Sequence, residues 1–297
     1  MQIVVAGGSG FLGSALVASW RSEGHQVTVL TRQPRGDDQL AWSPGTSGDG
    51  SWTRAVGAAD AVINLAGESI AGRRWTTARK AAIRDSRVRA TRALAAAITM
   101  APQPPSVFIS ASGVGIYGPR GDEPVTEDTP PGFDFLASVC RDWESEALVA
   151  SSSTRVVLLR TGLVLSKKGG ALPQIALPFQ VFAGGPLGSG RQYMPWIHLE
   201  DWLALTRWAL TTPSVTGPLN FAAPNPVTNA EFARALGRAL GRPAFMPAPA
   251  FALRLALGEM ADALLLTGQR VLPAKARALG FGFRYETIDE ALRAIYR

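Results

Sequence analysis

A glycine-rich turn between an apolar strand and a helix constrains this chain more than any other part of its sequence. Residues 7–13 read GGSGFLG, which puts Gly7, Gly10 and Gly13 at every third position. The segment before the turn is short and β-branched, and the segment after it has the apolar spacing of a helix. In such a turn the first glycine permits the sharp bend and the second lets the backbone approach a pyrophosphate. The third lets the helix pack closely on the strand.

The helix that follows this turn offers free N–H groups and a partial positive charge to phosphates. We therefore predict a Rossmann-type dinucleotide site, and the second predicted strand, residues 26–31, indicates which dinucleotide it takes. NAD-binding proteins place an acidic residue near the end of this strand to bond the ribose 2′-OH. Here the strand ends at Thr31-Arg32, and the next acidic residue is Asp37. Arginine pairs with a 2′-phosphate, so we predict NADP(H). Arg35 is a second candidate for that contact, and a solvated surface position is the alternative for Arg32.

The rest of the N-terminal half repeats the strand–helix pattern. Strands are predicted at 3–6, 26–31, 61–65, 107–110 and 155–160, and helices at 11–21, 76–100 and 135–151. A polar loop is expected between residues 33 and 51. This alternation predicts parallel βαβ units, hence an α/β fold with a doubly wound parallel sheet.

After residue 162 the pattern loosens. Residues 169–190 are rich in glycine and proline and are expected to form a loop that lines a cleft, and helices are predicted at 229–240, 250–266 and 288–296. We therefore predict an NADP-binding Rossmann domain over residues 1–162, to which parts of 195–225 return. Residues 163–297 are predicted to form a smaller, mainly helical C-terminal substrate lobe.

Composition excludes several classes of protein. The 297 residues carry a net charge of +7, but most of the basic residues are arginines spread along the chain without a nucleic-acid-binding motif, so we expect no nucleic-acid partner. The N-terminal MQIVVAGG lacks signal-peptide character, and no uncharged apolar run approaches the ~20 residues of a membrane span. One cysteine suits a reducing cytoplasm, and two distant histidines supply no metal cluster. We expect a cytoplasmic protein without membrane or metal binding.

With these motifs in place, the chain resembles the extended short-chain dehydrogenase/reductase superfamily over essentially its whole length. Within that superfamily it is similar to an atypical, epimerase-like subgroup, the NAD-dependent epimerase/dehydratase proteins with a characteristic C-terminal domain. The stretches that carry the resemblance are AGGSGFLG (6–13), NLAGESI (64–70), RRW (73–75), IRDSR (83–87), SASGVGIYG (110–118), DFLASVCRDWE (134–144), LRTGLVLS (159–166), GGPLGSGRQ (184–192), WIHLED (196–201), APNPVTNAEF (223–232) and GQRVLPAK (268–275).

The resemblance implies a set of cofactor contacts. Asn64 to Gly67 would pass beneath the adenine and ribose, Ser110 to Ser112 would face the nicotinamide, and Arg160 to Gly162 would begin the wall of the substrate cleft. The expected cofactor-binding residues are Gly7, Ser9, Gly10, Phe11, Leu12, Gly13, Thr31, Arg32, Asn64, Leu65, Ala66, Gly67, Ser110 and Ala111.

The superfamily's usual catalytic pair is missing. Its Tyr-x-x-x-Lys motif lies on the helix after the serine strand, where the lysine lowers the tyrosine pKa and holds the nicotinamide ribose. Aligned on Glu144, the tyrosine position holds Leu136 and the lysine position holds Cys140. A helical asparagine that often supports the proton relay is replaced by Arg87. The standard mechanism therefore does not transfer to this chain.

Three other side chains are candidate catalytic residues. Ser112 is a candidate hydrogen-bonding group for substrate, Tyr117 follows the same strand, and Glu68 follows the Asn-Leu-Ala-Gly segment. The alternatives are a packed aromatic for Tyr117 and a capping or salt-bridging role for Glu68. For Cys140 and His198, packing and a structural hydrogen bond are the preferred interpretations.

A basic stretch on the predicted helix 76–100 is a candidate anion receptor. Lys80, Arg84 and Arg87 share one face by their spacing, and Arg73, Arg74 and Trp75 precede them. A solvated face is the alternative, and Trp75 either stacks on a planar ligand or pins its loop. In the second lobe, residues 184–190 are expected to form a pocket rim, with Arg191, Gln192 and Tyr193 as polar groups.

These features predict an NADP(H)-dependent, epimerase-like oxidoreductase for a small polar substrate, anionic if that face lines the cleft. The alternative is a catalytically inactive NADP(H)-binding regulatory or scaffold protein. The oligomeric state has no signature in the sequence.

Overall fold

A parallel sheet forms the centre of the computed structural model, which describes residues 1–45 and 50–297. Seven strands lie in the order β11-β7-β5-β4-β1-β2-β3, and every neighbouring pair is parallel. The strands are β1 (Gln2–Ala6), β2 (Gln26–Thr31), β3 (Gln39–Ala41), β4 (Ala61–Asn64), β5 (Val107–Gly113), β7 (Arg155–Thr161) and β11 (Gly217–Phe221).

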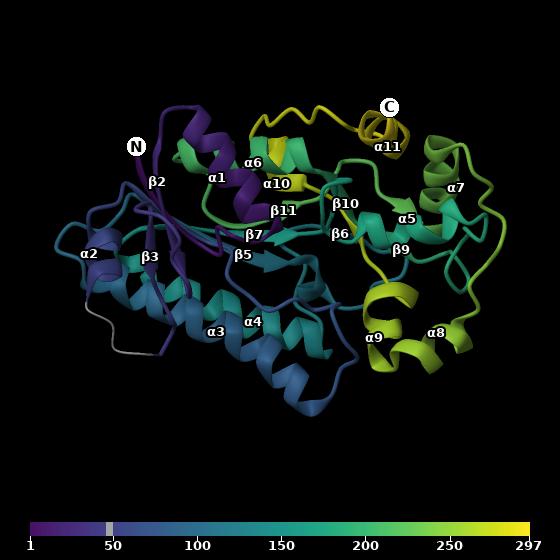
Figure 1. Ribbon diagram of the computed structural model, residues 1–297, viewed down its shortest axis with the longest axis horizontal. Helices are drawn as coiled ribbons and strands as arrows, with labels where there is room; N and C mark the ends of the chain where they lie inside the picture. Colours follow the sequence, from purple (N-terminus) through teal and green to yellow (C-terminus); the bar gives the residue numbers. More distant parts are fainter. Residues whose placement is uncertain (46–49) are drawn as a thin grey trace.

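Helices cover both faces of this sheet (Figure 1). One face carries α1 (Phe11–Ser22) and α6 (Leu199–Thr211), and the other carries α2 (Ser51–Gly57), α3 (Thr77–Met100) and α4 (Phe135–Leu148). Because successive strand residues point to opposite faces, Val5 packs with α1 and Val4 packs under α3. A strand buried on both faces reads as a continuous apolar run, as in IVVA of β1. The doubly wound α/β prediction is confirmed.

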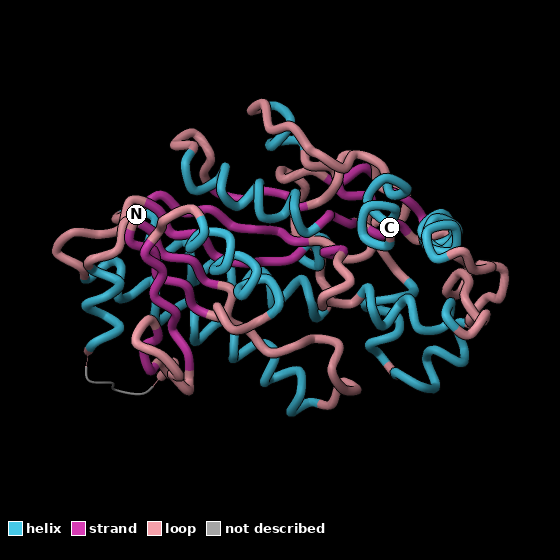
Figure 2. Tube along the Cα trace, turned by 45° about the horizontal axis from the view of Figure 1, so that its top comes forward, coloured by secondary structure: helices cyan, strands magenta, loops and turns pink. Residues whose placement is uncertain are grey.

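A second group of helices lies beyond the carboxyl ends of β5 and β7 (Figure 1). It contains α5 (Leu172–Gln180), α7 (Asn229–Leu240), α8 (Ala250–Leu257), α9 (Glu259–Ala261) and α11 (Ile288–Tyr296). Its own core joins Phe179, Phe232, Leu236 and Leu292 to Trp196. Figure 2 shows part of the sheet running toward this lobe, while the strands below the N-terminus run in a different direction. The mainly helical C-terminal lobe is thus present.

Short strands connect the lobe to the sheet. They are β8 (Leu163–Leu165) beside β10 (Trp196–His198), β9 (Tyr193–Met194) beside β12 (Val227–Thr228), and β6 (Pro124–Val125) beside β13 (Arg270–Val271). One-turn helices η1 (Val114–Tyr117) and η2 (Val149–Ser152), the π-helical turn η3 (Asp262–Leu266) and α10 (Ala274–Ala278) complete the described elements. The chain returns to the sheet through α6 and β11, both of which lie within the residue range 195–225.

Three segments differ from the sequence prediction. The expected loop 33–51 contains β3, and its residues 46–49 lie outside the described part of the chain. The expected loop 169–190 contains α5, whose buried Leu172, Ala176 and Phe179 recur at helical spacing despite Pro178. The expected helix 250–266 breaks at Gly258, where φ is +63° and the direction of the chain changes. Pro178 and the surrounding glycines obscured the helical spacing of α5. Gly258 ends a helix that the apolar spacing alone predicts to continue.

Candidate functional site

The glycine turn has the geometry that its sequence predicts. Gly7 has a φ of +80°, and a Cβ atom there would lie 2.7 Å from the backbone of Leu65. A Cβ at Gly13 would overlap the carbonyl oxygen of Gly7. The turn after β1 therefore lies directly against the turn after β4, and α1 begins as close to β1 as its backbone permits. These contacts leave room for glycine alone at both positions.

Among the described residues, no side chain caps the N–H groups at the start of α1. Gly10 is the N-cap, no side chain caps the helix, and its first turn holds no acidic residue. The ring of Phe11 is covered by the segment after β8, because a Cβ at Gly169 would lie 2.6 Å from it. An uncapped N-terminus beside a glycine turn suits a phosphate. Ser9 is exposed and lines a hollow of about 230 Å³ between α1 and the strands β2 and β3.

Arg32 extends from the end of β2 into solvent, next to the half-buried Thr31. Within residues 1–45 and 50–297 it forms no ion pair. Its guanidinium is therefore available to an anion at the edge of the sheet where the glycine turn lies.

The turn after β4 is held by a buried asparagine. The Nδ2 of Asn64 donates to Thr91 Oγ1 at 2.8 Å, and its Oδ1 accepts from the N–H of Ala66 at 3.2 Å. Asn64 therefore shapes this turn and does not point away from the protein. Leu65 and Ala66 are half-buried and Gly67 is exposed, so the turn offers its backbone to a ligand.

At the end of β5, Ser112 belongs to a buried ion-pair cluster. Its Oγ donates to Glu144 Oε1 at 2.7 Å, and Glu144 binds Arg160 through two hydrogen bonds of 2.9 Å. The Arg160 and Glu144 side chains are only 7% and 8% exposed. Burial alone would lower the pKa of Arg160, but the hydrogen bonds and charge of Glu144 outweigh it and raise that pKa. The Ser112 proton is thus committed to a carboxylate.

Tyr117 extends this cluster toward the last third of the chain. Its hydroxyl donates to Asn220 Oδ1 at 2.6 Å and accepts from Arg160 at 3.0 Å. The side chain is fully buried, and burial raises the pKa of Tyr117 to about 12. Glu127 continues the chain of contacts, accepting from the N–H groups of Asn220 and Lys275. Tyr117 therefore has the environment of the packed aromatic that the sequence left as its alternative.

The two positions of the missing catalytic pair lie near this cluster. A Cβ at Gly115 would lie 3.2 Å from Leu136, and one at Gly113 would lie 3.8 Å from Cys140 Sγ. Cys140 is buried, and that burial, with the charge of Glu144, raises the thiol pKa to about 11. A neutral thiol and a leucine therefore occupy these positions at physiological pH.

The basic face of α3 is mostly neutralised. Lys80 pairs with Glu259 at 2.7 Å, and Arg84 pairs with Asp142 at 2.7 Å. Glu68 forms an ion pair of 3.2 Å with Arg79, the salt-bridging alternative considered for it. Only Arg87 of the predicted face has no carboxylate partner among the described residues.

Two further candidates have structural contacts. Trp75 Nε1 donates to Ile70 O at 2.8 Å and its ring meets Phe135 edge-on, so it pins its loop. The Nδ1 of His198 accepts from the N–H of Glu200 at 3.1 Å and caps α6. In the second lobe, Gln192 donates to the carbonyl oxygens of Leu187 and Leu265 and so holds backbone.

Sequence reasoning missed Glu127, Asn220 and the backbone contact of Lys275. The segment 268–275 stands out as a motif in the sequence, but only the fold shows that it meets Glu127. In the described parts of the chain no group of three or more His, Cys, Asp or Glu residues is placed to hold a metal. Among residues 1–45 and 50–297, none of the helices combines the length and the hydropathy needed to cross a bilayer.

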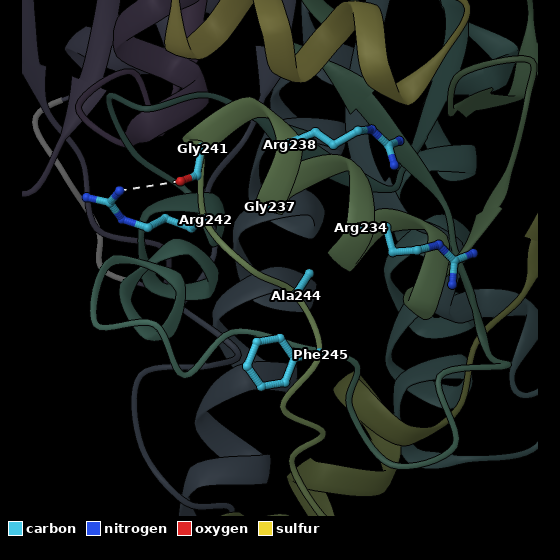
Figure 3. A pocket seen from close by; sticks show the side chains of 7 residues that line it. All are labelled: Arg234, Gly237, Arg238, Gly241, Arg242, Ala244 and Phe245. Atoms are coloured by element: carbon cyan, nitrogen blue, oxygen red, sulfur yellow. Dashed lines mark hydrogen bonds between the residues drawn. The ribbon is translucent and has the colours of Figure 1, made fainter.

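A larger hollow lies away from the glycine turn, on α7 and the segment after it (Figure 3). Its volume is about 460 Å³, and Arg234, Arg238 and Arg242 give it a basic character. Arg238 is paired with Asp289, and the Arg242 guanidinium lies over the Phe182 ring.

Comparison with known families matches most of the chain. Residues 3–221 match the model of the NAD dependent epimerase/dehydratase family, and residues 248–295 match a domain of unknown function, DUF1731. The epimerase family protein SDR39U1 homolog, chloroplastic, of Arabidopsis thaliana is 43% identical over 99% of this chain and 86% of its own length.

Solved structures show the same relationship. The human epimerase family protein SDR39U1 (isoform2), whose crystal structure is described as with NADPH, superposes with a TM-score of 0.91 at 38% identity, covering 100% of this chain and 99% of that one. A nucleoside-diphosphate sugar epimerase from Corynebacterium glutamicum gives a TM-score of 0.81 at 35% identity, covering 99% of this chain and 57% of that one.

Proposed function

The chain belongs to the NAD dependent epimerase/dehydratase family, and on that premise we propose that it is an NADP(H)-binding, epimerase-like oxidoreductase of the extended short-chain dehydrogenase/reductase superfamily. Its substrate is a small polar molecule. One observation carries the proposal: the glycine turn leads into an uncapped helix N-terminus beside an arginine, Arg32, that has no ion-pair partner in the described structure.

The residues at this edge of the sheet fit NADP(H). Gly10 and the first N–H groups of α1 would bind the pyrophosphate, and the turn at Leu65 to Gly67 would support the adenosine half. Arg32 would pair with the 2′-phosphate. The crystal structure of the human relative with NADPH supports this choice of cofactor. The remaining predicted contacts, from Ser9 to Leu12 and from Ser110 to Ala111, stay part of the proposal.

The bound cofactor supplies hydride transfer, and the protein supplies orientation and proton handling. We assign Ser112 and Tyr117 a positioning role, because the buried cluster with Glu144 and Arg160 holds both hydroxyls. Glu68, whose side chain is 41% exposed, stays the candidate to exchange a proton with substrate. The C-terminal lobe would supply the substrate contacts. A cytoplasmic location is part of the proposal, although the Arabidopsis relative is named chloroplastic.

Equilibrium titration with NADPH and NADH tests the cofactor. We expect NADPH to bind at least about tenfold more tightly, which corresponds to about 1.4 kcal/mol, the contribution expected of one charge-assisted contact. Equal affinities would contradict the assignment of Arg32.

Transfer of deuterium from 4-labelled NADPH to a panel of carbonyl and nucleotide-sugar substrates tests the reaction. Stereospecific loss of label supports an oxidoreductase. The second candidate, a catalytically inactive NADP(H)-binding regulatory protein, is motivated by Leu136 and Cys140. It predicts tight NADPH binding with no transfer from either face of the nicotinamide.

A further inference from the structure

Arg87, in the middle of α3, carries a half-buried guanidinium that no carboxylate of the described residues neutralises. Two arginines that precede it on α3 are paired, Arg84 with Asp142 and Arg79 with Glu68. The one hydrogen bond that the Arg87 side chain makes within residues 1–45 and 50–297 is from Nη1 to Ile83 O, at 2.9 Å. A guanidinium has five N–H donors, so most of its capacity remains for a ligand.

The surroundings of Arg87 hold its guanidinium beside the turn after β4. A Cβ at Gly67 would lie 3.1 Å from Arg87 Cζ, so a side chain at Gly67 would crowd it. On the other side, Arg87 Cζ lies 5.2 Å from the centroid of the Trp143 ring, in a cation–π contact from α4. Burial lowers the pKa of Arg87, and the charge of Glu68 offsets this only in part. The site thus maintains a cation at a cost in solvation that no described carboxylate offsets through a direct ion pair.

Cys140 and Arg87 approach the same region from two helices. Cys140, on α4, stands at the position of the superfamily's lysine, and its buried thiol is small and neutral. Arg87, on α3, lies over the ring of Trp143, which follows Cys140 by three residues, about one turn, on α4. A long cation from α3 therefore lies near the position that a lysine from α4 would otherwise occupy.

We propose that Arg87 binds the ribose hydroxyls on the nicotinamide side of bound NADP(H), taking over the cation that Cys140 has displaced from α4. The inference rests on the proposed function. A planar guanidinium donates two parallel hydrogen bonds, which matches a pair of neighbouring hydroxyls better than a single ammonium does. Trp143 is a positioning residue, because it holds the guanidinium plane without touching the cofactor, and Gly67 leaves room for the guanidinium beside the turn.

The binding of a cofactor fragment separates this role from a purely structural one. We compare NADPH with 2′,5′-ADP, which has the adenosine and 2′-phosphate but lacks the nicotinamide and its ribose. In Arg87→Met we expect the Kd for NADPH to rise about tenfold or more, while the Kd for 2′,5′-ADP changes less than about twofold. Arg84→Met, one turn earlier on α3, is the matched control and should change neither Kd.

Other outcomes overturn the inference in distinguishable ways. An unchanged Kd for NADPH in a folded Arg87→Met means that Arg87 does not contact the nicotinamide half. Equal weakening of both ligands means that Arg87 only supports the fold. If the methionine variant does not fold, Arg87→Lys replaces it, with NADPH weakened and 2′,5′-ADP spared as the expected result. If the wild type binds neither NADPH nor 2′,5′-ADP, the proposed function itself is wrong. Results with the Arg87 variants alone bear only on the role of Arg87.

Discussion

At the scale of single residues, two arrangements of charge bear on the candidate site. Glu144 and Arg160 are buried and satisfied by one another, so they belong to the interior. Arg32 and Arg87 have no carboxylate partner in the described structure and lie at the edge of the sheet where the glycine turn is. An anion-binding site needs cations that no carboxylate neutralises, such as Arg32 and Arg87. The protein beneath the site needs buried charges that are paired, such as Arg160 with Glu144.

Arg32→Asp tests the role of the unpaired Arg32. The substitution removes the partner of the 2′-phosphate and adds a repelling charge, so we expect NADPH binding to weaken by more than about tenfold. NADH lacks that phosphate, and its affinity should be preserved. Calorimetric titration of both cofactors measures the ratio, and an equal loss for both would show that Arg32 does not recognise the 2′-phosphate.

Glu144→Gln tests the buried ion pair. Removing this carboxylate leaves the Arg160 charge buried without its partner, which costs about 3 kcal/mol of unfolding free energy. Asp142→Asn on the same helix is the control. It removes an exposed partner of Arg84, whose side chain is 48% exposed, and should cost less than about 1 kcal/mol. Denaturant unfolding measures the loss of unfolding free energy in both variants. Similar losses would refute the expectation that the buried pair contributes more than the exposed one.

At the scale of elements, helix ends carry much of the information. The N-terminus of α1 is uncapped, whereas α7 and α11 each begin with a full capping box, from Thr228 and Glu231 and from Thr287 and Glu290. α6 is capped by the imidazole of His198, whose Nδ1 accepts from Glu200 N–H. The helix that would receive phosphates thus begins without a side-chain cap, which leaves its first N–H groups for a ligand.

The cap of α6 makes stability depend on pH. Burial lowers the pKa of His198 below 6.5 in the folded protein. Because the neutral ring is favoured by folding, its contribution is present above the unfolded pKa and is lost as the pH falls below it. His198→Asn keeps a capping oxygen without that titration. The wild type should therefore lose up to about 1 kcal/mol relative to the variant between pH 7.5 and 5. Urea unfolding curves of the wild type and His198→Asn across this pH range measure the difference in stability. A difference that does not change with pH would contradict the prediction.

Elements with regular apolar spacing were predictable from the sequence. The predicted strand 26–31 and helices 229–240 and 288–296 have the same bounds as β2, α7 and α11. α5 was missed because Pro178 lies inside it and glycines surround it. The helical spacing of its buried residues can be recognised only once the fold shows that they pack into the lobe. The sequence also missed β3, a strand of three residues that is ordered by pairing with β2.

The candidate site was predictable in part for a related reason. The glycine turn and Arg32 are local signals, readable from neighbouring residues. The cluster of Glu127, Asn220 and Lys275 joins residues far apart in the chain. Lys275 ends the motif GQRVLPAK, but that motif does not indicate which residues it contacts. The lack of a carboxylate partner for Arg87 among the described residues also depends on the fold. Glu68 and Asp142 pair with Arg79 and Arg84, which the sequence does not show.

At the scale of the whole molecule, hydrogen bonds to backbone tie the last third of the chain to the sheet. Asp201 accepts from the N–H groups of Arg284 and Tyr285 at 2.8 and 3.0 Å. Asn220 donates to Leu272 O at 3.0 Å, and Glu127 accepts from Lys275 N–H at 3.1 Å. These contacts are buried or half-buried, so separating the lobe from the sheet would leave several polar groups without partners.

We therefore expect one cooperative unfolding transition, which the cofactor shifts as a whole. At 100 times its Kd, NADPH should add about 2.7 kcal/mol and raise Tm by about 5 °C. Differential scanning calorimetry with and without NADPH measures both effects. Two separate transitions, with the cofactor shifting only one, would mean that the lobes unfold independently.

The place of β11 has a consequence for how the protein is made. β11 pairs with β7 and closes that side of the sheet, yet α5, α6 and the strands β8 to β10 are synthesised between them. While the ribosome is still adding those segments, β7 (RVVLLRT) presents an unpaired edge with four central apolar residues, able to pair with another nascent chain. The interval before residue 221 emerges is therefore the period in which this protein most needs a chaperone, and slower translation of residues 162–221 should increase its aggregation.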